Sequence, residues 1–281
     1  MLEAMRVHFC GTRGSTPVSG AGQSRYGGNT SCVGLAHDGA PPTVVLDAGT
    51  GLQQLPRALG GEPFRGTILL GHLHWDHTMG LPFSRAVDNP AAEVDLWIPA
   101  QGDTLAILER WMAPPHFPIT PRQLRGTWNF GGLEEGTHQI SGFEVLAREI
   151  PHKGGRTFGY RVSDARSAVA YLSDHCPTVL GPGEMGLGEL HPAAMALADG
   201  VDLLIHDAQY LDEELAARAD FGHSCAGYAV ALGEAARAKR VLLFHHDPPR
   251  TDPEIDALAA RYVDAAVPVE AARQGSVIDL P

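Results

Sequence analysis

A dense run of metal-ligand side chains occupies positions 72–77 of the chain. His72, His74, Asp76 and His77 place three imidazoles and one carboxylate within six positions. These are the groups that zinc and its first-row neighbours take as ligands. In extended backbone His72 and His74 point to the same side and can share one ion. After a turn, Asp76 and His77 can reach a second ion. The alternative is a polar loop that merely carries histidines, and four ligand-type residues in six positions argue against it.

Three further ligand-type side chains, His152, Asp174 and His245, each follow an apolar segment that is typical of a β-strand. Open α/β sheets place their sites at the carboxyl ends of strands, so these residues can meet the first motif in space. Taken singly, each could be an ordinary loop residue, but their order behind the first motif favours additional ligands. His246 neighbours His245, yet successive strand residues point to opposite sides, so we keep only His245 as a ligand.

Short apolar segments that end in polar residues or glycines must position these ligands. Several are continuously apolar, which favours strands that are covered on both faces. The first motif directly follows one of them, on a loop that we expect to precede a helix. The predicted strands are residues 6–10, 32–36, 43–47, 67–70, 94–98, 143–149, 157–162, 169–173, 201–205 and 240–244.

Helical patterns come between many of these strands. In the clearest one Thr251 and Glu254 form a capping box, and an apolar stripe at helical spacing then runs to Tyr262. No linker or low-complexity stretch divides the chain, so we expect one domain, residues 1–281, of mixed sheets packed between helices. The other predicted helices are residues 103–112 with Asp103 as the N-cap, residues 189–199, and a helix through residue 238 that Ser224 caps.

Composition and charge restrict the class of protein. The 281 residues are 44% hydrophobic and 19% charged, which is typical of a globular chain with a sizeable core. The net charge of −12 disfavours long nucleic acids, because such a surface repels phosphate backbones. Four scattered cysteines without a CxxC pair predict reduced, mostly buried thiols. With neither a signal-like start nor an apolar run of membrane-spanning length, we expect a cytoplasmic protein.

Taken together, these motifs resemble the metallo-β-lactamase fold superfamily, in its phosphodiesterase branch, over nearly the whole chain. Residues 44–51 resemble the family's first motif, a strand that ends in Asp-x-Gly at Asp47. Residues 72–77 match the HxHxDH signature without departure, and the three later candidates match the remaining ligand positions. The resemblance implies an α/β fold, a four-layer αβ/βα sandwich of two mixed β-sheets flanked by helices, with the site at the joined sheet ends.

Two further segments resemble the ribonuclease Z group, which processes the 3′ ends of tRNA. Residues 205–209 resemble its His-Glu-Ala-Thr segment, with Asp207 in place of Glu, and residues 221–225 resemble its His-Ser-Thr segment, with cysteine in place of Thr. Two segments near the start of the sequence, residues 11–17 and 25–32, resemble a bacterial subgroup of this branch. Its members are loosely described as phosphodiesterases or cyclic-nucleotide hydrolases, some of them similar to the anti-Pycsar enzymes that degrade cyclic mononucleotides.

The resemblance also implies a mechanism that uses two divalent metal ions per chain. Zinc is expected and manganese is the alternative, since the same ligands accept both. A hydroxide that bridges the ions would attack phosphorus, and Asp76 would orient it. His223 is the candidate general acid, with Asp207 fixing its tautomer, although His223 could also be an ordinary histidine at a helix start. Asp47 either supports a ligand or is an ordinary turn residue. The first ion takes His72, His74 and His152, the second takes Asp76, His77 and His245, and Asp174 bridges both.

The expected substrate is a small phosphodiester, above all a cyclic nucleotide. We expect neither a long nucleic acid nor a membrane as a partner, and we expect the protein to form a homodimer. In ribonuclease Z a long tRNA-gripping arm lies between the third and fourth motifs, and here His152 and Asp174 are only 22 positions apart. The alternatives are a tRNA 3′-processing endoribonuclease, a lactone, thioester or β-lactam hydrolase of the same fold, and a metal-dependent sensor without enzymatic activity.

Two other segments allow two interpretations each. The aromatic, proline-rich residues 111–118 could stack a base or pack on a partner subunit, and Trp111, Phe117 and Tyr26 are the candidate stacking side chains. Residues 27–31 could offer backbone N–H groups to a phosphate, although a tight turn is the simpler interpretation.

Overall fold

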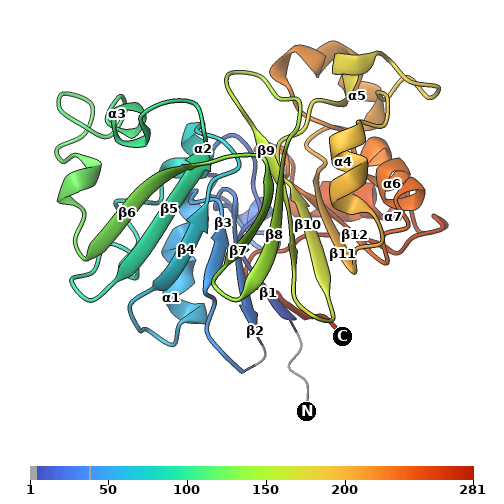
Figure 1. Ribbon diagram of the computed structural model, residues 1–281. Helices are drawn as coiled ribbons and strands as arrows, with labels where there is room; N and C mark the ends of the chain where they lie inside the picture. The colour runs from blue at the N-terminus through green and yellow to red at the C-terminus, as the bar shows by residue number, and fades with distance from the viewer. Residues whose placement is uncertain (1–4, 38) are drawn as a thin grey trace.

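The structure, a computed structural model, describes residues 5–37 and 39–281, which form two mixed β-sheets of seven strands each (Figure 1). The first sheet has the order β14-β1-β2-β3-β4-β5-β6 and the second the order β13-β12-β11-β10-β9-β8-β7. The strands of the first sheet are β1 Met5–Gly11, β2 Cys32–His37, β3 Val44–Leu46, β4 Arg65–Leu69, β5 Glu93–Pro99, β6 Thr127–Leu133 and β14 Val277–Asp279. Those of the second are β7 Gly136–Ile140, β8 Phe143–Glu149, β9 Phe158–Ser163, β10 Ala168–Leu172, β11 Leu203–Asp207, β12 Val241–Phe244 and β13 Val269–Ala271.

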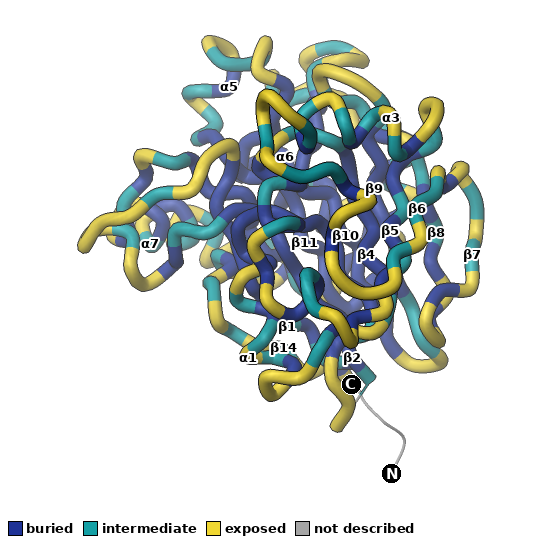
Figure 2. The backbone as a smooth tube through the Cα atoms, turned by 90° about the vertical axis from the view of Figure 1, so that its left-hand side faces the viewer, coloured by how far each residue is buried: buried dark blue, intermediate teal, exposed yellow. Residues whose placement is uncertain are grey.

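The two sheets pack face to face through a shared apolar core. Val7, Leu35 and Leu46 of the first sheet belong to the same cluster of buried side chains as Tyr160 and Ile205 of the second. Figure 2 shows buried backbone concentrated at the centre of the molecule and exposed backbone at its rim. The central strands are buried on both faces, which explains why their sequences are continuously apolar.

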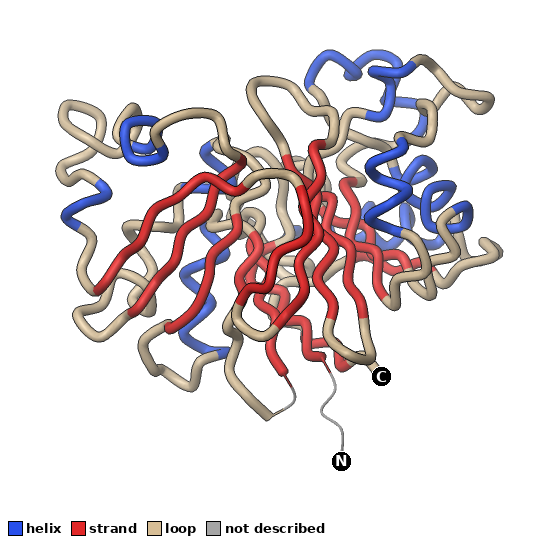
Figure 3. The backbone as a smooth tube through the Cα atoms, in the orientation of Figure 1, coloured by secondary structure: helices blue, strands red, loops and turns tan. Residues whose placement is uncertain are grey.

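Helices cover the outer face of each sheet. Leu55 packs with Ile68 outside the first sheet, and Leu197 and Leu232 pack with Leu204 outside the second. The order helix, sheet, sheet, helix confirms the predicted αβ/βα sandwich (Figure 3). The α-helices are α1 Leu55–Ala58, α2 Trp75–Thr78, α3 Thr104–Leu108, α4 Pro192–Ala198, α5 Asp212–Arg218, α6 Ala226–Ala235 and α7 Asp252–Ala260, and the 3₁₀ turns are η1 Ala21–Gln23, η2 Thr50–Gln54, η3 Pro121–Gln123, η4 Pro177–Leu180 and η5 Ala219–Phe221.

All ten predicted strands are present, and the four that the pattern did not predict are the edge strands of the two sheets, β6, β7, β13 and β14. Their residues are mostly exposed or half-buried. An edge strand faces solvent along one side, so it tolerates polar residues and glycines that a central strand does not. Apolar periodicity therefore could not reveal these strands.

The predicted helix starts are partly confirmed. Thr251 is the N-cap of α7, and its backbone N–H donates to Glu254 Oε2 at 2.7 Å, as the capping box predicts. Asp103 caps α3 by accepting from the N–H of Ala106 at 3.1 Å. The helix nevertheless ends at Leu108 rather than at residue 112. The chain has to leave helical geometry before two consecutive prolines at 114 and 115, and it does so through separate turns.

Two other helices are shorter than predicted. Ser224 does not cap α6, because its hydroxyl donates to the carbonyl of Cys225, and the helix begins after Cys225 without a side-chain cap. α6 ends at Ala235, since Arg237 has a left-handed φ of 57° that terminates the helix. α4 begins at Pro192 rather than at 189, because proline suits the first turn, where its missing N–H has no partner to lose. In the described part of the chain, none of the helices combines the length and apolarity needed to cross a membrane.

Candidate metal centre

The predicted ligands gather where carboxyl ends of central strands from both sheets meet. His72 follows β4, Asp174 follows β10 and His245 follows β12. β4 runs parallel to both of its neighbours, and β10, β11 and β12 run parallel to one another. Parallel strands bring their carboxyl ends to one edge, which is where open α/β sheets build sites.

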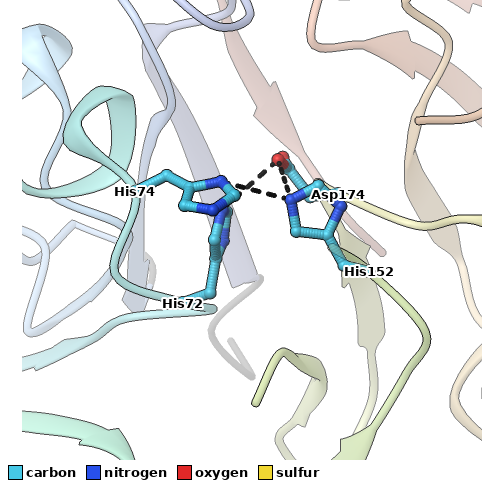
Figure 4. Close-up of side chains that lie close together, drawn as sticks. All are labelled: His72, His74, His152 and Asp174. Atoms are coloured by element: carbon cyan, nitrogen blue, oxygen red, sulfur yellow. Dashed lines mark hydrogen bonds and ion pairs between the residues drawn. The ribbon is translucent and has the colours of Figure 1, made fainter. Parts of the chain in front are cut away.

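A first cluster joins His72, His74, His152 and Asp174 (Figure 4). One ligand atom from each lies within 4.8 Å of those of the others. His72 Nε2 is 3.5 Å from Asp174 Oδ2, and His152 Nε2 is 3.4 Å from the same oxygen. His74 Nδ1 lies 3.3 Å from His152 Nε2. Three imidazole nitrogens and one carboxylate oxygen thus lie close together, and this is the donor set of a zinc-type site.

A second cluster joins Asp76, His77, His245 and the same Asp174. His77 Nε2 lies 3.2 Å from Asp76 Oδ2 and 3.2 Å from Asp174 Oδ1. His245 Nε2 lies 3.2 Å and 3.1 Å from the same two oxygens. Asp174 therefore presents one oxygen to each cluster, the arrangement expected of a bridging carboxylate.

The second half of the first motif lies on a helix and not on the expected loop. His74 is the N-cap of α2, and Asp76 and His77 lie in its first turn. The tight helical backbone separates this pair from His72 and His74, so the two halves of the motif serve different clusters.

Unpartnered polar atoms show that the clusters fit metal ions. His72 Nε2, His77 Nε2 and both carboxylate oxygens of Asp174 are buried and form no hydrogen bond within the described residues. Leaving such atoms unsatisfied costs about 1–3 kcal/mol each, and more for a charged group. Two divalent cations among these atoms would satisfy them all. The donor set of nitrogen and carboxylate oxygen suits zinc or manganese.

The charges within the clusters depend on one another. Burial alone would lower the pKa of His77, but Asp76, Asp174 and Asp47 raise it well above its usual value. Burial alone would raise the pKa of Asp174, but His245, His77 and His72 hold it well below its usual range. The carboxylates thus stay ionised although buried. A bound cation would take over the role of the His77 proton, so we expect metal binding to release protons.

The imidazoles of the first cluster are neutral. Burial lowers the pKa of His72 well below its usual value, and the neighbouring His77 lowers it further. Burial also lowers the pKa values of His74 and His152. A neutral imidazole keeps a free lone pair for a metal ion, which is the form that coordination requires.

Asp47 supports the second cluster from behind. Its Oδ2 accepts from His77 Nδ1 at 2.7 Å and from the Tyr171 hydroxyl at 2.7 Å, and its Oδ1 accepts from the N–H of Gly71 at 2.7 Å. The bond to Nδ1 leaves the other ring nitrogen of His77 aimed at Asp174. Of the two interpretations of Asp47, the geometry favours the support of a ligand, since partners of this kind fix a ligating imidazole.

Two other acceptors, which sequence reasoning missed, orient ligand candidates in the same way. His245 Nδ1 donates to Gln209 Oε1 at 2.9 Å, and His152 Nδ1 donates to the carbonyl of Gly222 at 2.7 Å. Gln209 lies within the segment that resembles His-Glu-Ala-Thr, which could have drawn attention to it. A backbone carbonyl such as that of Gly222 leaves no signal in a sequence.

Three residues with left-handed backbone lie at the clusters. Asp47 and His245 have φ values of 60° and 59°, and Ser15 has 53°, a region that residues other than glycine seldom adopt. The backbone N–H of Ser15 donates to Asp76 Oδ2 at 2.9 Å. Backbone strain of this kind typically gathers at functional sites, where surrounding contacts hold it in place.

His223 and Asp207 form a pair beside the clusters. His223 Nδ1 donates to Asp207 Oδ2 at 3.0 Å, and it lies 3.8 Å from Asp174 Oδ2. Burial opposes protonation of His223, but Asp207, Asp174 and Asp76 together raise its pKa to about 9. Asp207 also accepts from the backbone N–H groups of His175 and Gln209. Asp207 therefore favours the protonated imidazole and holds it in one orientation.

A cavity of about 860 Å³ opens onto both clusters. Asp76, Asp174 and His223 line it together with Tyr210 and Arg218. The cavity has the size of a small-molecule site and gives a substrate direct access to both clusters and to the His223 imidazole.

Other predicted features lie away from this cavity. His246 Nε2 donates to the carbonyl of Ala272 at 2.7 Å, and its ring packs edge-on against Tyr26. Tyr26 is buried and its hydroxyl donates to Asp256, so it is not placed to stack a substrate base. His246 and Tyr26 instead tie the start of the chain to its last third.

The glycine-rich segment at residues 27–31 forms a tight turn and not a phosphate cradle. The N–H of Gly27 donates to the carbonyl of Gln23 at 3.0 Å, and that of Asn29 donates to Gln274 Oε1 at 3.0 Å. The N–H of Thr30 donates to Thr50 Oγ1 at 2.9 Å. These donors are therefore not available to a ligand.

The chain between His152 and Asp174 consists of β9, β10 and short connections. Both strands are part of the second sheet, where β9 pairs with β8 and β10. No arm projects from this position within the described residues.

Comparison with known proteins agrees with this geometry. The family model of the Beta-lactamase superfamily domain matches residues 43–246. Ribonuclease Z from Salinibacter ruber is 29% identical over an alignment 278 residues long, and the match covers 84% of this chain and 85% of that protein. A new diphosphatase from the PhnP family has a similar fold, with 18% identity, a TM-score of 0.70 and coverage of 99% of this chain and 98% of its own. Human tRNase Z, short form, is similar at 20% identity and a TM-score of 0.66, with coverage of 98% of this chain and 99% of its own.

Proposed function

The chain belongs to the beta-lactamase superfamily and is a metal-dependent hydrolase, and from this premise we propose that it cleaves small phosphodiesters, cyclic nucleotides in particular. The observation that carries the proposal is the pair of clusters that share Asp174, with the His223 imidazole, bonded to Asp207, beside them in one cavity. Phosphodiester cleavage needs stabilisation of phosphoryl charge and a proton for the leaving alkoxide, and this arrangement supplies both.

We assign the ligands as the clusters divide them. When bound, two divalent ions would lower the pKa of water and neutralise charge on the phosphoryl oxygens. Asp76 lines the cavity and would orient the attacking water through its carboxylate. The ligands are His72, His74 and His152 for the first ion, Asp76, His77 and His245 for the second, and Asp174 for both.

His223 would donate a proton to the leaving oxygen. The Asp207 carboxylate raises the pKa of His223 and so favours a proton on the ring, and it holds Nδ1 so that the other nitrogen is free for the substrate. Asp207 already accepts from three donors, which favours a role in positioning His223 over a role as a metal ligand.

Processing of tRNA 3′ ends is the second candidate, because a relative named ribonuclease Z aligns with most of the chain. Two features disfavour processing of tRNA by this chain. The connection from His152 to Asp174 has no arm that could grip a polymer, and the net charge of −12 makes the approach of a long polyanion unfavourable. A small phosphodiester avoids both problems.

The test compares kcat/KM on a cyclic mononucleotide with kcat/KM on a 3′-extended tRNA at one salt and metal concentration. We expect efficient turnover of the cyclic mononucleotide and little cleavage of the tRNA. A clear preference for the tRNA would overturn the proposal and assign the chain to the ribonuclease Z activity. Cyclic dinucleotides, short RNA and bis-p-nitrophenyl phosphate complete the panel.

Three finer expectations belong to the same proposal. Zinc is the expected ion because the ligand set is rich in imidazole, and elemental analysis after reconstitution with zinc or manganese checks it. A homodimer is also expected, and light scattering measures the oligomeric state. A reducing, cytoplasmic location fits the four free and buried cysteines.

A further inference from the structure

A second cavity, of about 440 Å³, adjoins the 860 Å³ cavity that opens onto both metal clusters, which we call the catalytic cavity, and the two cavities share Trp75. Its other apolar walls are Met79 and Phe83, which follow α2, and Trp111 and Phe117, which follow α3. Phe83 and Phe117 meet edge to face, with ring centroids 5.7 Å apart, so the two segments form one continuous wall. We call this cavity the aromatic pocket.

The rings of the aromatic pocket are open to a ligand. Trp75 is 66% exposed and Phe83 is 55% exposed. Contiguous exposed apolar surface of this kind marks ligand-binding grooves and interaction sites. Trp75 also stands between His74 and Asp76 in the chain, so the pocket begins one residue away from both candidate metal clusters.

The charge of the aromatic pocket favours an electron-rich, anionic ligand. Arg110 and His116 are its polar residues, and no carboxylate lines it. Arg110 is exposed, and within the described residues its guanidinium makes no hydrogen bond or ion pair. In a chain with a net charge of −12, a carboxylate-free hollow with an unpaired guanidinium is poorly suited to cations and well suited to nucleotides.

We propose that the aromatic pocket is a base subsite: it holds the nucleobase of a cyclic nucleotide whose phosphodiester lies at the candidate metal centre. The inference rests on the proposed function and adds the part of the substrate that is recognised. Aromatic rings stack on any base, because every base has a π-face, so the subsite favours nucleotides over other phosphodiesters without selecting one base. The adjoining catalytic cavity and the concave shape favour substrate over a second copy of the chain as the occupant.

The test compares two substrates in three proteins. The substrates are 3′,5′-cyclic AMP and a base-free analogue, methyl ribofuranoside 3′,5′-cyclic phosphate. The proteins are the wild type, the double variant Phe83→Ala with Phe117→Ala, and the control Val263→Ala, which changes an 81% exposed side chain outside the pocket. All are loaded with zinc.

The double variant should lose about 5- to 140-fold in kcat/KM on cyclic AMP, mainly through KM, which is the fold-change for stacking one base. Its kcat/KM on the base-free analogue should stay within about twofold of wild type, and the control should match wild type on both substrates. Equal losses on both substrates, or no loss on either, would overturn the subsite. If the double variant does not fold, Phe83→Ala alone, at a ring more than half exposed, serves in its place.

A binding measurement separates failure of the subsite from failure of the proposed function. If the wild type hydrolyses neither cyclic phosphate, the proposed function fails. Equilibrium dialysis that compares the affinity of the protein for AMP with its affinity for ribose 5-phosphate then tests the base subsite by itself. Tighter binding of AMP by the wild type but not by the double variant supports it, and equal binding of the two ligands overturns it. If light scattering shows that the double variant turns a dimer into a monomer, a second copy covers the pocket and the base subsite is wrong.

Discussion

At the scale of single residues, Asp207 binds three groups at once and so fixes the orientation of His223. Its Oδ2 accepts from His223 Nδ1 at 3.0 Å and from the N–H of His175 at 3.3 Å, and its Oδ1 accepts from the N–H of Gln209 at 3.0 Å. Two of these bonds come from backbone, which cannot move without moving the end of a strand. His223 is therefore held against the cavity by a rigid partner.

The role of His223 depends on the leaving group. A ribose alkoxide needs a proton when it leaves, whereas an activated nitrophenolate does not. We expect His223→Ala to lower kcat about 10²- to 10⁴-fold on a cyclic nucleotide, the usual range for general acid catalysis, with a much smaller loss on bis-p-nitrophenyl phosphate. Steady-state kinetics on both substrates measures the difference. Equal losses would mean that His223 binds substrate or supports a ligand and does not donate the proton.

The pH dependence of turnover tests the coupling between His223 and Asp207. Because an acid must carry its proton, kcat on a cyclic nucleotide should fall as the pH rises through the pKa of His223. Asp207 is the strongest of the neighbours that raise that pKa to about 9. Asp207→Asn removes the negative charge, so the alkaline limb of the pH profile should move to lower pH. An alkaline limb that stays in place in this variant would assign it to another group.

At the scale of secondary-structure elements, the residue that follows β3 forms hydrogen bonds that connect β3 to the end of β4, to β10 and to α2. Asp47 follows β3 directly and binds the N–H of Gly71 after β4, the hydroxyl of Tyr171 in β10, and His77 in α2. Tyr171 belongs to the second sheet, so a single carboxylate connects both sheets with one ligand candidate. The left-handed backbone of Asp47 is held by these contacts.

Removal of the Asp47 carboxylate should weaken the second ion more than the first. Asp47→Ala leaves His77 Nδ1 without an acceptor, and loss of such a partner typically costs 10- to 100-fold in metal affinity. Competition titration with a chelating dye measures the two affinities separately. Tyr171→Phe is the matched control, because it removes one bond to Asp47 and leaves His77 bound. Equal weakening of both ions in Asp47→Ala would contradict a specific role at the second cluster.

At the scale of the whole molecule, the candidate centre joins the two halves of the sandwich. The first half supplies the ligand candidates of the HxHxDH motif, and the second half supplies His152, Asp174 and His245. Bound ions would therefore link the two sheets at one end of their shared core. A ligand that binds only the folded state stabilises it by mass action, so metal should raise the free energy of unfolding.

Chelation should accordingly lower the melting temperature. We expect EDTA to reduce Tm by roughly 5–10 °C, as a few kcal/mol would in a protein of this size, and two equivalents of zinc to restore it. Asp174→Ala, which removes the shared ligand, should show little response to either addition. Differential scanning fluorimetry together with elemental analysis provides the measurement. A wild-type Tm that changes with neither EDTA nor zinc would argue against a metal centre between the sheets.

The sequence by itself determined the features that depend on local spacing and composition. Apolar segments and helical patterns predicted one domain of mixed sheets packed between helices, because buried strands need continuous apolar segments, and the family resemblance of the motifs implied the αβ/βα sandwich. The spacing of residues 72–77 predicted a ligand-rich motif, and all seven predicted ligand residues lie in the two clusters. The assignment of Asp76 and His77 to a loop was wrong, since the short α2 is too brief to leave a periodic pattern.

The tertiary structure decided the features that depend on partners distant in the sequence. The edge strands could not be predicted, because solvent along one side lets them carry polar residues and glycines in place of apolar ones. Gln209 and the carbonyl of Gly222 became visible only once strand ends met, and Tyr26 proved to face Asp256 instead of the cavity. The aromatic pocket likewise joins residues that follow α2 to residues that follow α3. Spacing along a chain carries no information on such contacts, because packing between elements sets them.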